Sequence, residues 1–282
     1  MKFILFIFLL TFTSLFALDI TLVPYMEKSS YKNNYKHSSS VNGFYTKLST
    51  KQYSLELNYE NTSLDYNSTL TNYTQTDYTF SYSLYLSKNY RLKTACHNMS
   101  GDSKQNISAK VYSLGLQYLK KRSFDLGVDL TYSDYSKSES VNDVYQTNTY
   151  ARVTFGDYKS LMGKYIVKLD VSFIHPKSLD SNSTLSSSYT SYGLSLKQFK
   201  GDFINSIGTW GGEQIYAVKD NGFSIYSLNE LYNSSYYISS RYAVSENMGI
   251  TFSYKVEKFN DLDTLKDDSV RRYLLSLDYT IK

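Results

Sequence analysis

Residues 248–257 read MGITFSYKVE, and apolar and polar side chains alternate along this stretch. The apolar positions are Met248, Ile250, Phe252, Tyr254 and Val256. Because successive side chains of a β-strand point to opposite faces, the stretch predicts a strand with one apolar and one polar face. The same alternation recurs in other parts of the chain, at 78–86, 124–132, 165–173 and 273–281.

The composition also favours strands. The 282 residues include 31 Tyr and 15 Phe but only 2 Pro, and aromatic residues favour strands whereas Pro interrupts them. After the N-terminal residues, no apolar run reaches the length of about 20 residues that a membrane-spanning helix needs. Cys96 is the only cysteine, so no disulfide can form within the chain. The net charge of +4 comes without a cluster of Lys and Arg, which gives nucleic-acid binding no support.

A soluble β-sandwich would show the same alternation, so other features must distinguish it from a membrane barrel. The segments run to roughly ten residues, which is the length a tilted strand needs to cross a bilayer. Aromatic residues recur at segment ends, for example Tyr53, Tyr118 and Tyr165, where they could form two interfacial girdles. Short connections alternate with long polar ones, as in bacterial outer-membrane barrels. The short ones fall near 49–51, 88–89, 120–123, 160–163 and 245–247, and the long ones at 63–71, 97–106, 136–143, 176–188 and 260–268.

These features predict an all-β fold, a transmembrane antiparallel up-and-down barrel of about fourteen strands with both chain ends on the periplasmic side. A barrel of twelve strands with two extended loops is the alternative, because four of the segments are weakly patterned. The predicted spans are 19–30, 36–48, 52–62, 73–87, 90–97, 107–119, 124–135, 145–156, 164–175, 188–198, 203–214, 231–244, 248–259 and 270–282.

The first 17 residues have the layout of a secretory signal peptide. Lys2 gives a positive start, 3–16 is almost wholly apolar, and Ala17 is a small residue at the expected cleavage site. A retained helical anchor is the alternative, but the apolar run is shorter than a spanning helix. We therefore expect export of the chain and two regions, a signal peptide at 1–17 and a barrel at 18–282.

The last strand, 272–282, resembles the C-terminal signal by which the assembly machinery recognises bacterial outer-membrane β-barrels. Such barrels usually end on an aromatic residue, whereas this chain ends Ile281-Lys282 and its last aromatic residue is Tyr279. In length and strand number the chain is similar to small monomeric fourteen-stranded porins. The resemblance implies a monomer or weak oligomer in the outer membrane, with membrane lipid and the assembly machinery as partners.

Each predicted strand carries one row of apolar side chains and one row of polar side chains. If the apolar rows face lipid, the polar rows face the lumen. These rows carry charges of both signs, which predicts a hydrophilic passage for small solutes with weak ion selectivity; a lumen filled by ion pairs, without conduction, is the alternative. The predicted lumen charges are Glu56, Glu60, Arg91, Lys93, Asp125, Asp129, Arg152, Lys168, Asp170, Arg241, Lys255, Glu257, Arg272 and Asp278.

The stretch 210–230 does not resolve into crossing strands, and we expect it either to fold inward as a constriction or to form an ordinary external hairpin. Its glycine pair allows a sharp bend, and Asp220-Asn221-Gly222 is a turn signal. The residues of the possible constriction are Trp210, Gly211, Gly212, Glu213, Lys219 and Asp220.

Other functions find less support in the sequence. His37, His97 and His175 map to predicted external strand ends or loops, where a hydrolase could place a catalytic base, but nothing brings them into triad geometry. Their spacing also predicts no metal site, and no cofactor is implied. A non-conducting barrel that serves adhesion or envelope structure remains the main alternative to a porin-like channel.

Overall fold

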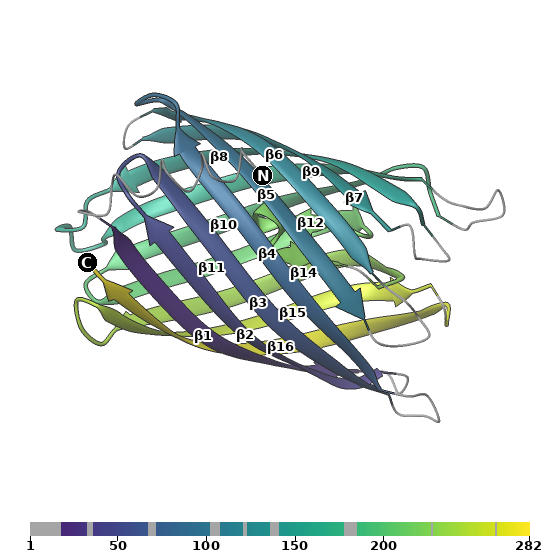
Figure 1. The fold of residues 1–282 in the computed structure, drawn as a ribbon. Coiled ribbons are helices and arrows are strands. Elements are labelled where there is room, and N and C mark those ends of the chain that lie inside the picture. Colours follow the sequence, from purple (N-terminus) through teal and green to yellow (C-terminus); the bar gives the residue numbers. More distant parts are fainter. Residues whose placement is uncertain are drawn as a thin grey trace, which may run out of the picture.

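A computed structural model describes residues 18–282 apart from 33–35, 67–71, 102–107, 121–122, 136–140, 178–184, 227 and 263. The predicted signal peptide, 1–17, lies outside the described residues. Within them, fourteen antiparallel strands form one closed barrel (Figure 1). The strands are β1 (Asp19–Tyr31), β2 (Lys36–Ser49), β3 (Tyr53–Tyr66), β4 (Tyr73–Tyr85), β5 (Tyr90–Gly101), β6 (Ala109–Lys120), β7 (Phe124–Asp134), β8 (Asp143–Gly156), β9 (Lys164–Lys177), β10 (Tyr189–Lys200), β11 (Phe203–Gln214), β14 (Glu230–Ala243), β15 (Met248–Asp261) and β16 (Lys266–Ile281).

The prediction of an up-and-down barrel of about fourteen strands is confirmed, and the twelve-stranded alternative is wrong. Each strand pairs with its neighbours in sequence, except that β11 pairs with β14 across an inserted hairpin. The strands begin and end within a few residues of the predicted positions. Several of them continue further than predicted into the segments expected to be long loops, as β3 does to Tyr66 and β5 to Gly101.

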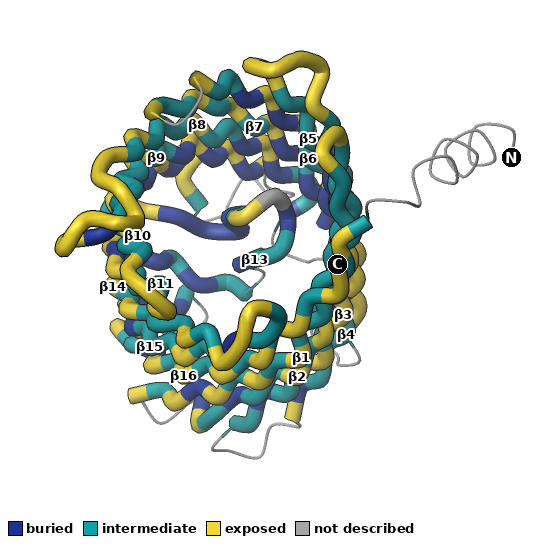
Figure 2. Tube along the Cα trace, turned by 90° about the vertical axis from the view of Figure 1, so that its left-hand side faces the viewer, coloured by how far each residue is buried: buried dark blue, intermediate teal, exposed yellow. Residues whose placement is uncertain are grey.

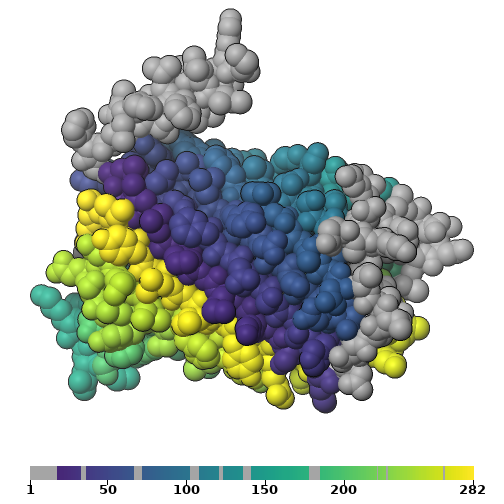
Figure 3. Space-filling model, turned by 60° about the horizontal axis from the view of Figure 1, so that its bottom comes forward, coloured from purple at the N-terminus to yellow at the C-terminus, as the bar shows by residue number. Residues whose placement is uncertain are grey.

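The barrel closes between the first and last strands. β1 pairs with β16 from Ile20 opposite Ile281 to Tyr31 opposite Val270. Figure 3 shows these strands side by side on the surface, in purple and yellow. Closure gives every wall strand two neighbours, so the backbone groups of the wall can be paired without a free edge, as a bilayer requires.

The apolar rows face outward. Leu114, Leu130, Ile207 and Ile238 are each about half exposed although they lie in the middle of long strands. Aromatic pairs lie toward the two ends of the wall, such as Tyr90–Tyr118 at one end, with ring centroids 5.5 Å apart, and Tyr132–Tyr145 toward the other, at 5.3 Å. An apolar belt between aromatic residues is the exterior expected of a transmembrane barrel.

The two ends of the barrel differ in their connections. The end that holds the start of β1 and the end of β16 carries short connections, for example between β2 and β3, and is called the turn end here. The opposite end, called the loop end, carries the longer connections and includes the one from β11 to β14. No helix within the described residues is long and apolar enough to cross a membrane.

Candidate functional site in the barrel lumen

The connection from β11 to β14 folds into the barrel instead of extending its wall. This segment, 215–229, is called the lumen hairpin. It contains β12 (Val218–Lys219), the short 3-10 helix η2 (Asp220–Gly222) and β13 (Ser224–Ile225), and β12 pairs with β13. Figure 2 looks along the barrel and shows β13 inside the ring of wall strands.

The lumen hairpin is fixed to the wall mainly by side chains. The Val218 backbone N–H donates to Gln146 Oε1 of β8, and Gln146 Nε2 donates back to the Val218 carbonyl, both at 2.8 Å. Lys219 Nζ donates to Ser172 Oγ of β9 at 3.0 Å. A reciprocal pair of bonds with one backbone residue imitates the pairing of an additional strand, and therefore holds the hairpin at a defined height.

The tip and the returning limb reach other parts of the wall. Gly222 lies against Ala95 and His97 of β5, where an added Cβ would be 3.8 and 3.9 Å from their Cβ atoms. The Phe223 ring meets the Tyr45 ring of β2 edge to face, with centroids 5.7 Å apart. Since its anchors lie on β8, β9, β5 and β2, the hairpin crosses the lumen.

The first residues of the lumen hairpin form a small apolar core with the loop end of the wall. Ile215 and Ala217 have no exposed surface. They belong to a buried cluster with Val144 of β8 and Ile174 of β9, and the Tyr216 ring lies 5.1 Å from that of Tyr135. Burial of apolar side chains in the lumen stabilises the inward position of the hairpin.

The predicted constriction residues lie in two different places. Lys219 and Asp220 are in the lumen hairpin, but Trp210 and Gly211 to Glu213 belong to β11 in the wall. The register of β11 against β14 shifts between Gly211 and Gln214, and Gly212 has a φ of 98°. A bulge with a left-handed glycine bends the strand, so the glycine pair starts the turn into the lumen without being part of the constriction.

Ten of the predicted lumen charges line two cavities on opposite sides of the lumen hairpin. The loop-end cavity, of about 340 Å³, includes Glu60, Lys255, Glu257 and Arg272. The turn-end cavity, of about 440 Å³, includes Arg91, Lys93, Asp129, Arg152, Lys168 and Asp170. The other four also lie on the inward phase of their strands and form ion pairs, Glu56 with Lys47, Asp125 with Arg152, and Arg241 with Asp278.

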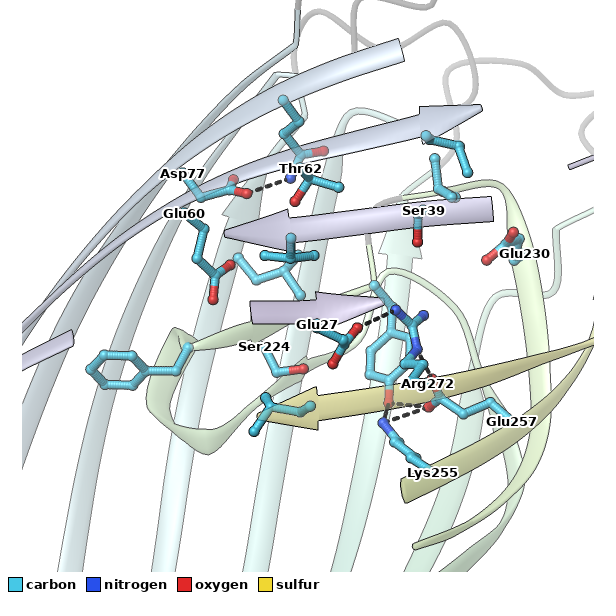
Figure 4. A pocket seen from close by; sticks show the side chains of 18 of the residues that line it. Glu27, Ser39, Glu60, Thr62, Asp77, Ser224, Glu230, Lys255, Glu257 and Arg272 are labelled. Carbon is cyan, nitrogen blue, oxygen red and sulfur yellow. Dashed lines mark hydrogen bonds and ion pairs between the residues drawn. The ribbon is translucent and has the colours of Figure 1, made fainter. Parts of the chain in front are cut away.

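A buried ion-pair cluster ties the returning limb of the hairpin to the wall of the loop-end cavity. Glu257 accepts from Lys255 Nζ at 2.7 Å and from Arg272 Nε at 2.8 Å, and Arg272 also binds Glu27 (Figure 4). The Tyr226 hydroxyl of the hairpin donates to Glu257 Oε1 at 2.7 Å. Burial and the Glu257 carboxylate raise the pKa of Tyr226 to about 12, so the hydroxyl remains a donor at neutral pH.

The comparisons with known proteins agree with this architecture. No protein-family model and no curated sequence matches the chain. Solved structures match over almost the whole chain. A bacterial polysaccharide outer membrane secretin is 6% identical in sequence with a TM-score of 0.55, and the match covers 94% of this chain and 99% of the secretin chain. The CymD monoaromatic hydrocarbon channel is 10% identical with a TM-score of 0.56, and the match covers 94% of this chain and 88% of the CymD chain. Acinetobacter baumannii Omp33 is 7% identical with a TM-score of 0.51, and the match covers 93% of this chain and 99% of the Omp33 chain. The chain has the outer-membrane β-barrel fold. At these identities the likeness concerns the fold alone.

Within this barrel, the three histidines lie in β2, β5 and β9, which are not neighbours in the wall. His97 was expected at an external strand end or in a loop but lies within β5, buried, with Nε2 3.2 Å from Asp77 and Nδ1 2.8 Å from Thr79. The strand was predicted to end too early because its last residues alternate only weakly. Cys96, the only cysteine, is exposed on the outward face of β5. Among the described residues, no group of three His, Cys, Asp or Glu side chains could hold a metal ion.

Several residues of the lumen were missed from sequence. Lys197 lines the turn-end cavity and Glu27 the loop-end cavity. Both lie in strands with weak alternation, and both share the inward phase of Gly193 and Tyr25 in those strands, so the phase rule could have found them. Gln146 and Tyr226 could not be found in this way, because Gln146 acts by binding the lumen hairpin and Tyr226 belongs to that hairpin and acts by binding the wall.

Proposed function

We propose that this barrel is an outer-membrane channel for passive diffusion of small hydrophilic solutes, and that the lumen hairpin is its restriction. One observation carries the proposal: the lumen is lined by charged and polar side chains and keeps a cavity on either side of the hairpin. A barrel that served only as an anchor would be more stable with an apolar or fully packed interior. CymD, which shares the fold, is described as a channel for monoaromatic hydrocarbons.

We also propose how the protein reaches its membrane. Residues 1–17 direct export and are removed, and 18–282 enters the outer membrane through recognition of β16 by the assembly machinery. The barrel then works as a monomer or weak oligomer in contact with lipid. A barrel with an apolar exterior and paired backbone has the properties that a bilayer requires.

Single-channel conductance tests the proposal. The protein is purified in detergent from the membranes of cells that express the full chain and is added to planar bilayers. We expect discrete conductance steps, and several-fold larger steps when 217–226 is replaced by a short Gly-Ser linker. Absence of conductance from both proteins, each shown to be folded by its heat-dependent shift on a denaturing gel, would favour a structural or adhesive barrel instead.

A point variant with a matched control covers the case in which the shortened protein does not fold. Gln146→Leu removes the bonds that hold Val218, so it should raise the conductance or make it fluctuate. Gln198→Leu is the same change on β10, outside both cavities, where the side chain binds Met162 and Tyr165 near the turn end. It should leave the conductance unchanged.

A further inference from the structure

The turn-end cavity has more cationic than anionic side chains. Six cations line it, Arg91, Lys93, Arg152, Lys168, Lys197 and Lys219, against three carboxylates, Asp129, Asp170 and Asp220. They come from β5, β8, β9 and β10 of the wall and from the lumen hairpin. Arg152 and Lys168 form ion pairs, with Asp125 at 3.1 Å and with Asp170 at 3.3 Å.

The other four cations take no part in the ion pairs of the described residues, and their charged groups contact neutral side chains. Lys93 Nζ donates to the Tyr150 hydroxyl at 3.1 Å, Lys219 Nζ to Ser172, and Arg91 to Gln117, while Lys197 lies 6.0 Å from the Phe199 ring centroid. These contacts satisfy donors without neutralising charge, so cationic side chains outnumber the carboxylates around the cavity by six to three. An excess of one sign of charge around a cavity between low-dielectric walls attracts a counter-charge.

Three of the six cations converge on one aromatic ring. The charged groups of Lys93, Arg152 and Lys168 lie 5.4, 5.5 and 5.5 Å from the Tyr150 ring centroid. The negative face of the Tyr150 ring attracts the three cations and so reduces their mutual repulsion, but the ring has no net charge and does not neutralise them. The arrangement therefore holds several donors in place around one point.

The loop-end cavity provides the contrast. Its five carboxylates, Glu27, Glu60, Asp77, Glu230 and Glu257, all have hydrogen-bonded partners on side chains, with Arg272, Tyr25, His97, Lys36 and Lys255 among them. The positive excess is thus a property of the turn-end cavity and not of the whole lumen.

We infer that the turn-end cavity is an anion-binding site, and that the channel passes small organic oxyanions such as short dicarboxylates in preference to cations. Ammonium and guanidinium donors suit the oxygens of carboxylates and of phosphate, which form short, charge-assisted hydrogen bonds. The volume of about 440 Å³ suits a small organic anion. Lys219 completes the site from the hairpin, so the element that restricts the lumen also supplies part of its selectivity.

The inference rests on the proposed function, and two measurements keep them apart. The first is the reversal potential in planar bilayers under a potassium chloride gradient, which we expect to show preference for chloride. The second is calorimetric titration of the detergent-purified protein with succinate and, separately, with inorganic phosphate; it does not require conduction. The test variant is Lys93→Gln/Lys197→Gln/Lys219→Gln.

A control variant removes the same charge elsewhere. Lys32→Gln/Lys258→Gln/Lys266→Gln changes exposed lysines toward the loop end. We expect the test variant to lose anion preference and to bind succinate at least about tenfold more weakly, since each lost charge-assisted bond can supply that factor, and the control to match the unchanged protein. Replacement of the three lysines by Arg should preserve both properties.

The outcomes separate clearly. Binding of succinate but not of phosphate identifies an organic carboxylate as the ligand, and binding of both identifies a general oxyanion site. Absence of binding by either probe, or an anion preference that survives in the test variant, overturns the inference. Absence of conductance together with binding of succinate would count against the channel while supporting the anion site.

Discussion

Glu257 is a buried carboxylate on which both the wall and the lumen hairpin depend. Its side chain is fully buried and receives bonds from Lys255, Arg272 and Tyr226. Burial of a carboxylate is costly unless cations and donors compensate it. Here two cations and a hydroxyl do so, and Glu27 satisfies Arg272 further. Because Tyr226 belongs to the lumen hairpin, one carboxylate links hairpin and wall.

Glu257→Gln should therefore destabilise the barrel strongly. The neutral amide leaves Lys255 and Arg272 with too little negative charge, and breaking such a buried network costs about 3–5 kcal/mol. The matched control is Glu56→Gln, whose partner Lys47 is 38% exposed; loss of that pair should cost about 1 kcal/mol or less. Urea unfolding in detergent micelles, followed by tryptophan fluorescence, measures both. An equal loss of unfolding free energy in the two variants would show that the bonds of Glu257 do not stabilise the barrel more than a surface ion pair does.

At the scale of the element, the wall strands could be predicted from sequence and the lumen hairpin could not. In a wall strand, successive side chains face the apolar exterior and the polar lumen in turn, which imposes a period of two on the sequence. Ile215 to Ala217 carry the same apolar character as an outward-facing stretch, but they pack in one buried cluster with Val144 and Ile174 inside the lumen. Whether this segment folds inward or extends outward depends on contacts with strands that are distant in sequence. The sequence alone therefore did not distinguish the inward from the external hairpin.

The turn from β11 into the lumen hairpin depends on one of the two glycines near the end of β11. Gly212 has a φ of 98°, and a Cβ there would meet the Thr190 carbonyl oxygen at 2.4 Å, whereas a Cβ on Gly211 would have ordinary contacts at 3.6 Å. Gly212→Ala should thus cost at least about 1–3 kcal/mol, and Gly211→Ala no more than about 0.5 kcal/mol. Urea unfolding measures the cost. Limited proteolysis between 215 and 229 should be faster only in Gly212→Ala, and similar behaviour of the two variants would refute this account of the turn.

Across the whole barrel, the two faces of the wall differ in polarity. The outward rows are apolar, and the inward rows form ion pairs and line the cavities. The barrel therefore reverses the distribution of apolar and charged side chains that a soluble domain has between its interior and its surface. This reversal explains how a chain with 20% charged residues can present an apolar exterior. It also explains why the phase of alternation, once the apolar rows are placed outward, predicted most lumen charges from sequence although Lys197 and Glu27 were missed.

Adjacent residues at one depth provide the direct test of this arrangement. Ile238 of β14 points outward and is 56% exposed, while its neighbour Ser239 points inward and meets Ser253 of β15 at 2.8 Å. Ile238→Lys would place an ammonium among acyl chains at a cost of about 2–4 kcal/mol. Ser239→Lys would place it in a polar lumen, at a cost of about 1 kcal/mol or less. Reversible unfolding from phospholipid vesicles gives both values, because the penalty for Ile238→Lys requires a bilayer. If both substitutions cost the same in vesicles, or if Ser239→Lys costs more, then the apolar rows do not contact lipid and neither the channel nor its anion site can stand as described.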